Sequence, residues 1–226
     1  MNIEITTRKR HPVEDEVLLQ LLHRSFQQWN EHGIEAKFLS QDLEYFRHTM
    51  RRAVVVLAIP VNGSGVIVNG SKPVGMLCVN CYKDKHAFDF YLTVAPEAKQ
   101  QGVGTRMLEY AVTQLKKRGY KYLADTTSVK AEWSVKWHLK NGYRIVGFGK
   151  GREPYSDSYR FRKQIAPSLL WNGPLAPLTA QCCYLFWRMV RWLTQRVDGE
   201  FNLLGKMLRK VRGKKMWKYG TILMSN

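Results

Sequence analysis

The amino-acid sequence predicts a mixed α/β fold, with helices against one sheet, followed by a basic helical extension. Strand-like and helix-like periodicities alternate along residues 3–164, and this order favours a mixed sheet covered by helices. The composition changes after residue 165: residues 166–226 hold ten Lys and Arg against two acids, and four of the seven tryptophans. We therefore expect a folded domain over residues 1–165 and a basic, aromatic-rich extension over residues 166–226.

The first half of the expected domain begins with a short strand and two helices. Apolar residues recur at helical spacing from Val17 to Trp29, which predicts a helix over 13–29. Ser40 is a suitable N-cap for a second helix over 41–50. Apolar, β-branched or alternating segments predict the strands of this half, at 3–7, 53–59, 72–82 and 86–94.

The second half alternates between helices and strands. A helix over 102–118 ends in three cations and Gly119, which suit a helix C-terminus. Gly142 ends a later helix over 130–141. Strands are expected around these helices at 122–126, 143–149 and 159–164. A strand meander followed by the order β-α-β-α-β predicts one mixed sheet.

The segment from Leu92 to Thr105 carries the most specific chemistry. A strand runs into a turn with Gly102 and Gly104, and the turn opens a helix. Backbone N–H groups in such a turn point to one place, the helix dipole adds positive potential, and glycine lets a phosphate approach closely. The pattern predicts a pyrophosphate site, although an ordinary strand–turn–helix joint has the same glycines. A Walker loop is excluded because its Lys-Ser/Thr pair is missing, and a Rossmann fingerprint because only two glycines occur.

Two motifs resemble the GNAT N-acetyltransferase superfamily, and the resemblance covers roughly residues 3–165. The family signature Arg/Gln-x-x-Gly-x-Gly/Ala is similar to residues 99–104, with Lys99 in place of Arg or Gln. Further along, Trp137-His138-Leu139-Lys140-Asn141-Gly142-Tyr143 resembles the family's Leu-Tyr-x-x-x-Gly-Phe. The resemblance implies a mostly antiparallel, twisted sheet flanked by helices.

The resemblance also implies the reaction and its donor. The donor would be acetyl-CoA or another acyl-CoA, and the acyl group would pass directly to an amine, which is an EC 2.3.1 type of transfer. In the family the fourth strand parts from the fifth and the pantetheine arm lies between them, so backbone contacts are implied for Leu92, Thr93 and Val94. Pyrophosphate contacts are implied for the N–H groups of Gln100, Gln101, Gly102, Val103, Gly104 and Thr105, with a further contact expected from Lys99.

Three side chains are candidates for the proton transfers. His138 stands where the family has the tyrosine that protonates the leaving thiolate, and an imidazole can donate a proton at neutral pH. The alternative is that His138 only packs near CoA. Asp89 and Tyr91 are the candidate bases, because strand alternation places both on one face. The alternative for Asp89 is a solvent-facing or ion-paired carboxylate.

Charge and cysteine content limit the partners. The net charge of +18 favours an anionic partner such as nucleic acid, a phosphorylated small molecule or an acidic membrane. Cys78 and Cys81 share a strand pattern that puts their sulfurs on opposite faces, so no metal site is expected. The first ten residues lack a signal-like apolar region, which indicates a cytoplasmic location. Three prolines within residues 164–187 argue against a membrane-spanning helix there.

The extension shows an amphipathic helical pattern from Leu178 onward. One apolar stripe holds Leu178, Cys182, Leu185, Phe186, Met189 and Leu193. A second amphipathic segment covers 201–211, and cations follow over 209–218. This pattern is typical of peripheral contact with an anionic membrane, here through residues 178–218 at its inner face. The alternatives are packing on the domain, a homodimer interface and, less favoured, nucleic acid.

The sequence thus predicts an acyl-CoA-dependent N-acyltransferase that uses acetyl-CoA as co-substrate, and no metal, to acylate an amine. The alternative is a CoA-binding or docking module of the same fold, with little catalysis, whose basic tail binds an anionic membrane or RNA. The histidine in place of tyrosine at position 138 keeps this alternative open. The acceptor amine and the acyl chain length stay open as well.

Overall fold

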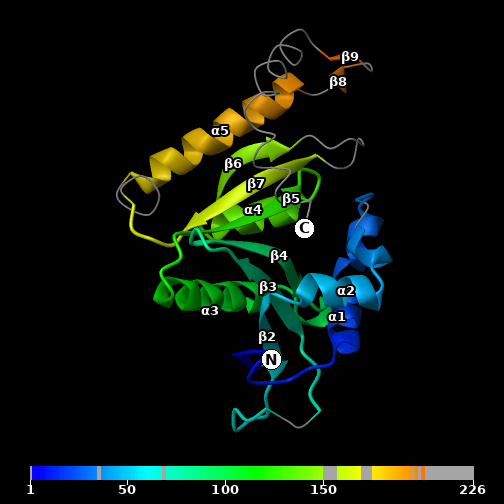
Figure 1. Ribbon diagram of the computed structural model, residues 1–226. Coiled ribbons are helices and arrows are strands. Elements are labelled where there is room, and N and C mark those ends of the chain that lie inside the picture. Colours follow the sequence, from blue (N-terminus) through cyan, green and yellow to red (C-terminus); the bar gives the residue numbers. More distant parts are fainter. Residues whose placement is uncertain are drawn as a thin grey trace.

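The computed structural model describes residues 2–34, 37–67, 70–149, 157–168, 175–194, 196–197 and 200–201. Seven strands form one sheet in the order β1-β2-β3-β4-β5-β7-β6 (Figure 1). All neighbouring strands are antiparallel except β4 and β5, which are parallel. This mixed, mostly antiparallel sheet with flanking helices confirms the predicted fold class.

The elements follow the predicted order. The helices are α1 (Asp15–Glu31), α2 (Leu43–Met50), α3 (Val103–Lys117), α4 (Glu132–Lys140) and α5 (Ala176–Thr194), with the short 3-10 helices η1 (Lys37–Ser40) and η2 (Pro96–Ala98). The strands of the sheet are β1 (Ile3–Thr7), β2 (Val54–Pro60), β3 (Gly75–Cys81), β4 (His86–Val94), β5 (Tyr122–Ser128), β6 (Arg144–Gly149) and β7 (Ser158–Gln164). A small hairpin of β8 (Arg196–Val197) and β9 (Glu200–Phe201) follows α5. Each predicted strand and helix of residues 3–164 is present, with its ends shifted by at most three residues.

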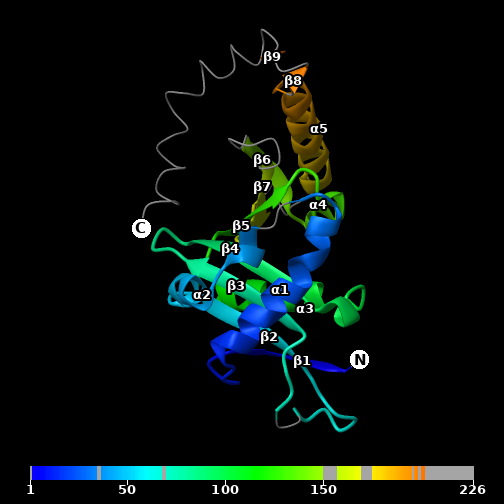
Figure 2. The ribbon, with the colours of Figure 1, turned by 90° about the vertical axis from the view of Figure 1, so that its right-hand side faces the viewer.

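Helices cover both faces of the sheet. Figure 1 shows α3 on one face of the N-terminal strands and α1 and α2 on the other, and Figure 2 gives the same arrangement from the side. Five consecutive residues of β2 and five of β3 are buried, as is typical of strands that are covered on both sides. Fully buried Leu57, Leu77 and Met107 belong to this core, and burial of each such side chain contributes about 1.5–3 kcal/mol.

β4 and β5 part after a short contact, and we call this place the strand fork. They are paired only over His86–Phe88 and Tyr122–Ala124. Beyond that contact β4 continues against β3 as far as Val94, and β5 continues against β7 as far as Ser128. Because α3 follows β4 and α4 follows β5, both helices begin toward the open end of the strand fork.

A β-bulge at Phe90 changes which way the residues of β4 point. Tyr91 is paired with Cys78 and Asp89 with Val79, so Phe90 is the extra residue. Cys78 and Val79 are neighbours on β3 and point to opposite faces. Asp89 and Tyr91 therefore lie on opposite faces of the sheet. The expectation that they share a face is wrong, because the bulge interrupts the alternation on which it depended.

α5 packs along the edge strand β6 (Figure 1). Val190 is buried, and Tyr184 and Trp187 pack against the core. The predicted amphipathic helix is present, but its apolar stripe faces outward, since Leu185 and Phe186 are exposed. Among the described residues, no helix is both long enough and apolar enough to cross a membrane. The domain boundary at 165/166 stays a prediction, and the sequence predictions for residues 202–218 lie outside the described residues.

The start of α2 differs from the prediction. The helix begins at Leu43, and the Oδ1 of Asp42 accepts a hydrogen bond from the N–H of Tyr45 at 2.7 Å. Ser40 ends η1 instead of capping α2. Serine and aspartate are about equally good N-caps, so the sequence alone could not choose between the two positions.

The cap can be tested by two matched substitutions. Asp42→Ala removes the side-chain acceptor and should lower the free energy of unfolding by about 1 kcal/mol in urea denaturation. Asp42→Asn, which keeps a side-chain acceptor at the same position, is the control and should change it by less than about 0.5 kcal/mol. A loss for Asp42→Asn as large as that for Asp42→Ala would contradict the observed cap.

Candidate active site

Backbone donors gather in the turn at the open end of the strand fork, residues 100–105, which we call the glycine turn. Gln100 and Gly102 have positive φ angles of 60° and 74°, and α3 begins directly afterwards at Val103. Within the described residues, the backbone N–H groups from Gln100 to Thr105 have no protein acceptor, as expected for a helix start. No acidic side chain lies in the first turn of α3. The glycine turn therefore fits an anionic group such as a pyrophosphate.

Side chains beside the glycine turn brace it against α1. The Nζ of Lys99 donates to the carbonyl oxygen of Ser25 at 3.3 Å, and burial lowers the pKa of Lys99. The Nε2 of Gln101 donates to the carbonyl oxygen of Glu97 at 2.9 Å, and Glu97 pairs with Arg24 at 2.7 Å. These side chains hold the turn, and its main chain supplies the free donors. The phosphate contact expected of Lys99 stays a prediction, since its ammonium is directed to α1.

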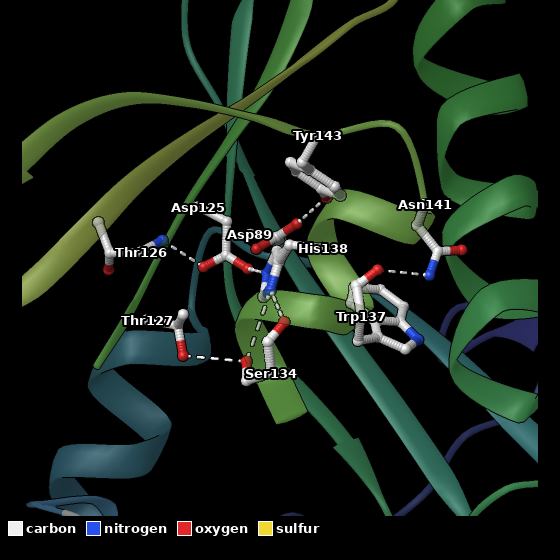
Figure 3. A network of polar contacts seen from close by, with 9 residues as sticks. All are labelled: Asp89, Asp125, Thr126, Thr127, Ser134, Trp137, His138, Asn141 and Tyr143. Carbon is white, nitrogen blue, oxygen red and sulfur yellow. Dashed lines mark hydrogen bonds and ion pairs between the residues drawn. The ribbon is translucent and has the colours of Figure 1, made fainter. Parts of the chain in front are cut away.

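Two carboxyl groups meet at the closed end of the strand fork. Asp89 of β4 and Asp125 of β5 directly follow the last paired residues, Phe88 and Ala124. Figure 3 shows the two carboxyl groups side by side, and burial together with the charge of Asp125 raises the pKa of Asp89. Asp89 is 3% exposed and the side chain of Asp125 is 12% exposed. Because two carboxylates this close cannot both stay ionised, the carboxyl pair holds a proton.

His138 of α4 completes this cluster. Its Nδ1 lies 2.6 Å from the carbonyl oxygen of Ser134, and a carbonyl only accepts, so Nδ1 carries a proton. Its Nε2 contacts the Oδ2 of Asp125. With Nδ1 protonated, this contact needs a second proton, on either the carboxyl group or the imidazole. Asp125 and His138 thus share one proton.

Burial sets the protonation of the cluster. Burial, reinforced by the carboxylate of Asp125, raises the pKa of Asp89 well above its usual range. Burial also raises the pKa of Asp125 to about 7, although hydrogen bonds from Asp89 and the N–H of Thr126 oppose the rise. Burial lowers the pKa of His138, against the attraction of Asp89. The shared proton can therefore move at near-neutral pH.

Neighbouring side chains fix the orientation of the cluster. The hydroxyl of Tyr143 donates to the Oδ2 of Asp89 at 2.6 Å, and burial keeps it protonated by raising its pKa. The ring of His138 stacks on Phe161 with centroids 4.5 Å apart. The Oγ1 of Thr127 donates to the Oγ of Ser134 at 2.9 Å, directly beside the imidazole. The imidazole is therefore held in one rotamer.

Tyr91 lies on the opposite face of the sheet, toward α2. Its hydroxyl donates to the Oε1 of Gln41 at 2.7 Å, and its ring stacks with Phe46 at 6.3 Å. Burial raises the pKa of Tyr91 to about 12. The hydroxyl thus stays protonated at neutral pH, and the sheet separates it from the carboxyl pair.

The indole of Trp137 connects the two ends of the strand fork. A Cβ added to Gly104 would lie 3.7 Å from this indole and 3.7 Å from the Cγ2 of Val94. Trp137 also meets His138 edge-on, with ring centroids 5.1 Å apart. α4 therefore packs along the strand fork, from the glycine turn to the cluster.

Asp89 and His138, which the structure brings together, were both predicted from the sequence, but Asp125 was missed and Tyr143 was named only as the last residue of a motif. One signal was available. Asp89 and Asp125 are each the fourth residue of a strand, and equal positions of neighbouring parallel strands in this register face each other. The pairing of β4 with β5 had to be known before that signal could be used.

The residues considered for metal binding do not cluster. Cys78 and Cys81 both lie in β3, one buried and one half-buried. Among the described residues, there is no group of three His, Cys, Asp or Glu side chains close enough to hold a metal ion.

Solved structures with this fold include several acetyltransferases. A GNAT-family acetyltransferase from Staphylococcus aureus Mu50 matches with a TM-score of 0.52 and 18% identity, over 73% of this chain and 100% of its own. The ribosomal-protein-S18-alanine N-acetyltransferase from Escherichia coli matches at 0.51 and 16%, over 74% and 96%. An aminoglycoside 6'-N-acetyltransferase complexed with coenzyme A matches at 0.51 and 17%, over 74% and 99%. At these identities the likeness shows the fold.

The family itself follows from the sequence match. The model of the acetyltransferase (GNAT) family matches residues 18–143, which is more than half of the chain. The chain therefore belongs to the GNAT acetyltransferase family, as the two motifs indicated. No curated protein matches it. The matched residues include the glycine turn, the carboxyl pair and His138.

The raised pKa of Asp125 predicts a pH-dependent change in stability. Between about pH 4 and pH 7, Asp125 is protonated in the native state but ionised in the unfolded chain. Its contribution to the free energy of unfolding is therefore complete below about pH 4 and is lost as pH rises through about 7. Asp125→Asn removes the ionisation and can still donate to Nε2 of His138. The melting temperature of the variant minus that of the wild type should therefore be more positive at pH 8 than at pH 5.

The lowered pKa of His138 acts in the opposite direction, since its stabilisation is lost as pH falls below about 6.5. Because the imidazole contacts Asp125, the same comparison is also made in the His138→Phe background, which removes the titration of the imidazole from the difference. Glu132→Gln, at an exposed position of the same helix, is the control and should give the same difference at both pH values. Equal differences for Asp125→Asn at pH 5 and pH 8 would contradict the raised pKa.

Proposed function

We propose that this protein is an acyl-CoA-dependent N-acyltransferase that transfers an acetyl group directly to an amine. The observation that carries the proposal is the strand fork, which has free backbone donors at its open end and a shared proton at its closed end. The reaction requires both features: a binding site for the phosphates of the donor, and a group that can transfer a proton where the acyl group passes from sulfur to nitrogen.

Main-chain groups are proposed to bind the acyl-CoA donor. The N–H groups of the glycine turn would hold the pyrophosphate, and Leu92 to Val94 would pair with the amides of the pantetheine arm, since β4 has no β5 partner there. An N–H at or near Val94 would polarise the thioester carbonyl. The donor supplies an activated acyl group, and every other task falls to residues of the chain.

Asp125 and His138 are proposed to take part in the proton transfers. In the transfer, the ammonium first loses one proton to water, and the neutral amine nitrogen then forms a bond to the carbonyl carbon. As the carbon–sulfur bond breaks, the nitrogen loses a second proton and the departing sulfur gains one, so one proton is released overall. We assign the proton given to sulfur to the pair of Asp125 and His138, which takes the role expected of His138 alone. Asp89, whose pKa burial raises, is proposed to position Asp125 and not to act as the base. Tyr91 is proposed to contact the acceptor from the opposite face.

The acceptor class is proposed to be a primary amine. Two of the similar structures are described as acting on an alanine of a ribosomal protein and on aminoglycosides, and both are amine acceptors. The test is release of CoA from acetyl-CoA with a panel of amines, with the amide product detected by mass spectrometry. Tight CoA binding without turnover for any amine would instead support the CoA-binding module considered from the sequence.

Donor binding can be tested at Gly104. Gly104→Glu places a carboxylate among the donors of the glycine turn and should lower CoA affinity by about 100-fold or more in calorimetry, since charge repulsion replaces an anion site. Gly104→Ala is the matched control, because its Cβ would make only ordinary contacts at 3.7 Å, and it should leave affinity within a few-fold. Unchanged CoA affinity in the glutamate variant would remove the phosphate assignment.

The proton role can be tested with a double-mutant cycle. His138→Phe keeps the stacking on Phe161 but removes the proton, and should lower kcat by about 10²-fold with little change in the KM of the donor. Asp125→Asn should cost a similar factor. The double variant should cost no more than either single variant, because the two residues act as a unit. Losses that multiply, or a normal kcat for His138→Phe, would leave the pair with a packing role.

A further inference from the structure

α5 uses only one of its sides to pack on the domain. Tyr184, Trp187 and Val190 make up the side toward β6 and the core. This side covers the edge strand of the sheet, which would otherwise offer unpaired backbone groups to other chains. α5 is thereby presented as a fixed element on the outside of the molecule (Figure 1).

The other side of α5 carries an exposed apolar surface, which we call the α5 stripe. Its members recur at helical spacing and are Leu178, Cys182, Leu185, Phe186 and Met189. The four larger side chains are 51–65% exposed. Leu175, just before α5, is exposed as well, and the other exposed large apolar side chains of the described residues occur singly, at Tyr45, Val66 and Val146. Isolated residues of this kind need no explanation, whereas a contiguous apolar surface indicates a contact that it serves.

Positive charge accompanies the α5 stripe. α5 contains two arginines and no acid. Arg188 is exposed beside the stripe and lies over the ring of Tyr184 at 5.5 Å. The chain that follows the small hairpin, residues 202–226, contains seven Lys and Arg and no Asp or Glu. A surface that covers the α5 stripe must therefore be apolar and must also carry negative charge.

Charge distinguishes three surfaces that could cover the α5 stripe: a second copy of this chain, nucleic acid and a lipid bilayer. A second copy of this chain would bring two basic helices and two basic tails together, at a net charge of +18 each. Duplex nucleic acid offers negative charge but no apolar layer for leucine and phenylalanine side chains. A bilayer with anionic lipids offers both: acyl chains for the stripe, and headgroups for the exposed Arg188 and for a chain with a net charge of +18.

We propose that the α5 stripe inserts into the interface of an anionic lipid bilayer, with α5 lying in the plane of the membrane. The apolar side chains supply the part of the affinity that does not depend on salt, and the flanking cations supply the part that does. This inference is independent of the proposed function, because the α5 stripe shares no residue with the strand fork.

The test is co-sedimentation of the full-length protein with vesicles of phosphatidylcholine containing phosphatidylserine, against vesicles of phosphatidylcholine alone. The protein should sediment with the anionic vesicles at about 0.05 M salt, and less at about 1 M salt, where the Debye length is roughly 3 Å. Absence of sedimentation with anionic vesicles at low salt would overturn the proposal.

Substitutions separate the stripe from the charge. Leu185→Glu with Phe186→Glu should weaken vesicle binding by about 10-fold or more. Leu178→Glu, at the other end of the stripe, should weaken it as well if the double variant does not fold. Val66→Glu is the matched control, since Val66 is 60% exposed and lies far from α5 in the sequence. Equal binding by the control and by the stripe variants would contradict insertion, and CoA affinity should be the same in all of them.

Two further measurements complete the test. Light scattering reports the oligomeric state, and a dimer that the stripe variants dissociate would show that the α5 stripe is an interface between copies, which overturns the proposal. Binding of a short RNA that the stripe variants abolish would overturn it too. Vesicle binding by a monomeric wild type, with loss only in the stripe variants, is the expected result.

Discussion

The parting of β4 and β5 is the constraint on which the rest of the site depends. Three residues of each strand are paired, and beyond them each strand keeps only its outer neighbour. The backbone of β4 up to Val94 is thereby left available on one side, and the glycine turn begins where β4 ends. The bulge at Phe90 belongs to the same constraint, because a bulge bends its strand and, in this register, directs Asp89 toward Asp125 and Tyr91 toward α2.

At the closed end of the strand fork, burial shifts the pKa values of two different titrating groups in opposite directions. An exposed aspartate and an exposed histidine differ by more than two pKa units, and each unit corresponds to about 1.4 kcal/mol. Burial raises the pKa of Asp125 to about 7 and lowers that of His138, so both shifts favour a proton on the carboxyl group of Asp125. The carbonyl oxygen of Ser134 fixes the tautomer of His138, and the hydroxyl of Tyr143 donates a hydrogen bond to Asp89. Each member of the cluster therefore has a hydrogen-bond partner.

The sequence predicted the parts of this structure that local patterns determine. Helical and strand periodicity gave the order of the elements through residue 164, and the glycines at 102 and 104 gave the turn. It could not give the parts that depend on contacts between distant segments. Phe90 looks like any other residue of an alternating strand, and only the register against β3 makes it the bulge. Asp125 stands in a strand without a local motif, and its importance follows from lying opposite Asp89. The choice of Asp42 over Ser40 as N-cap likewise depends on where η1 ends.

For α5, too, the sequence did not determine which side of the helix packs on the domain. Its sequence is apolar around most of its circumference, so periodicity alone identifies an amphipathic helix but does not say which side the domain will take. The structure assigns the aromatic side, with Tyr184 and Trp187, to β6, where wide flat rings cover the edge of a sheet, and leaves the aliphatic residues and one phenylalanine outside. Among the described residues, no second protein layer covers the outer side of α5, although its side chains are as large as the ones in the core. Because α5 holds two arginines and no acid, the surface that completes their burial must be one that repels neither apolar groups nor positive charge.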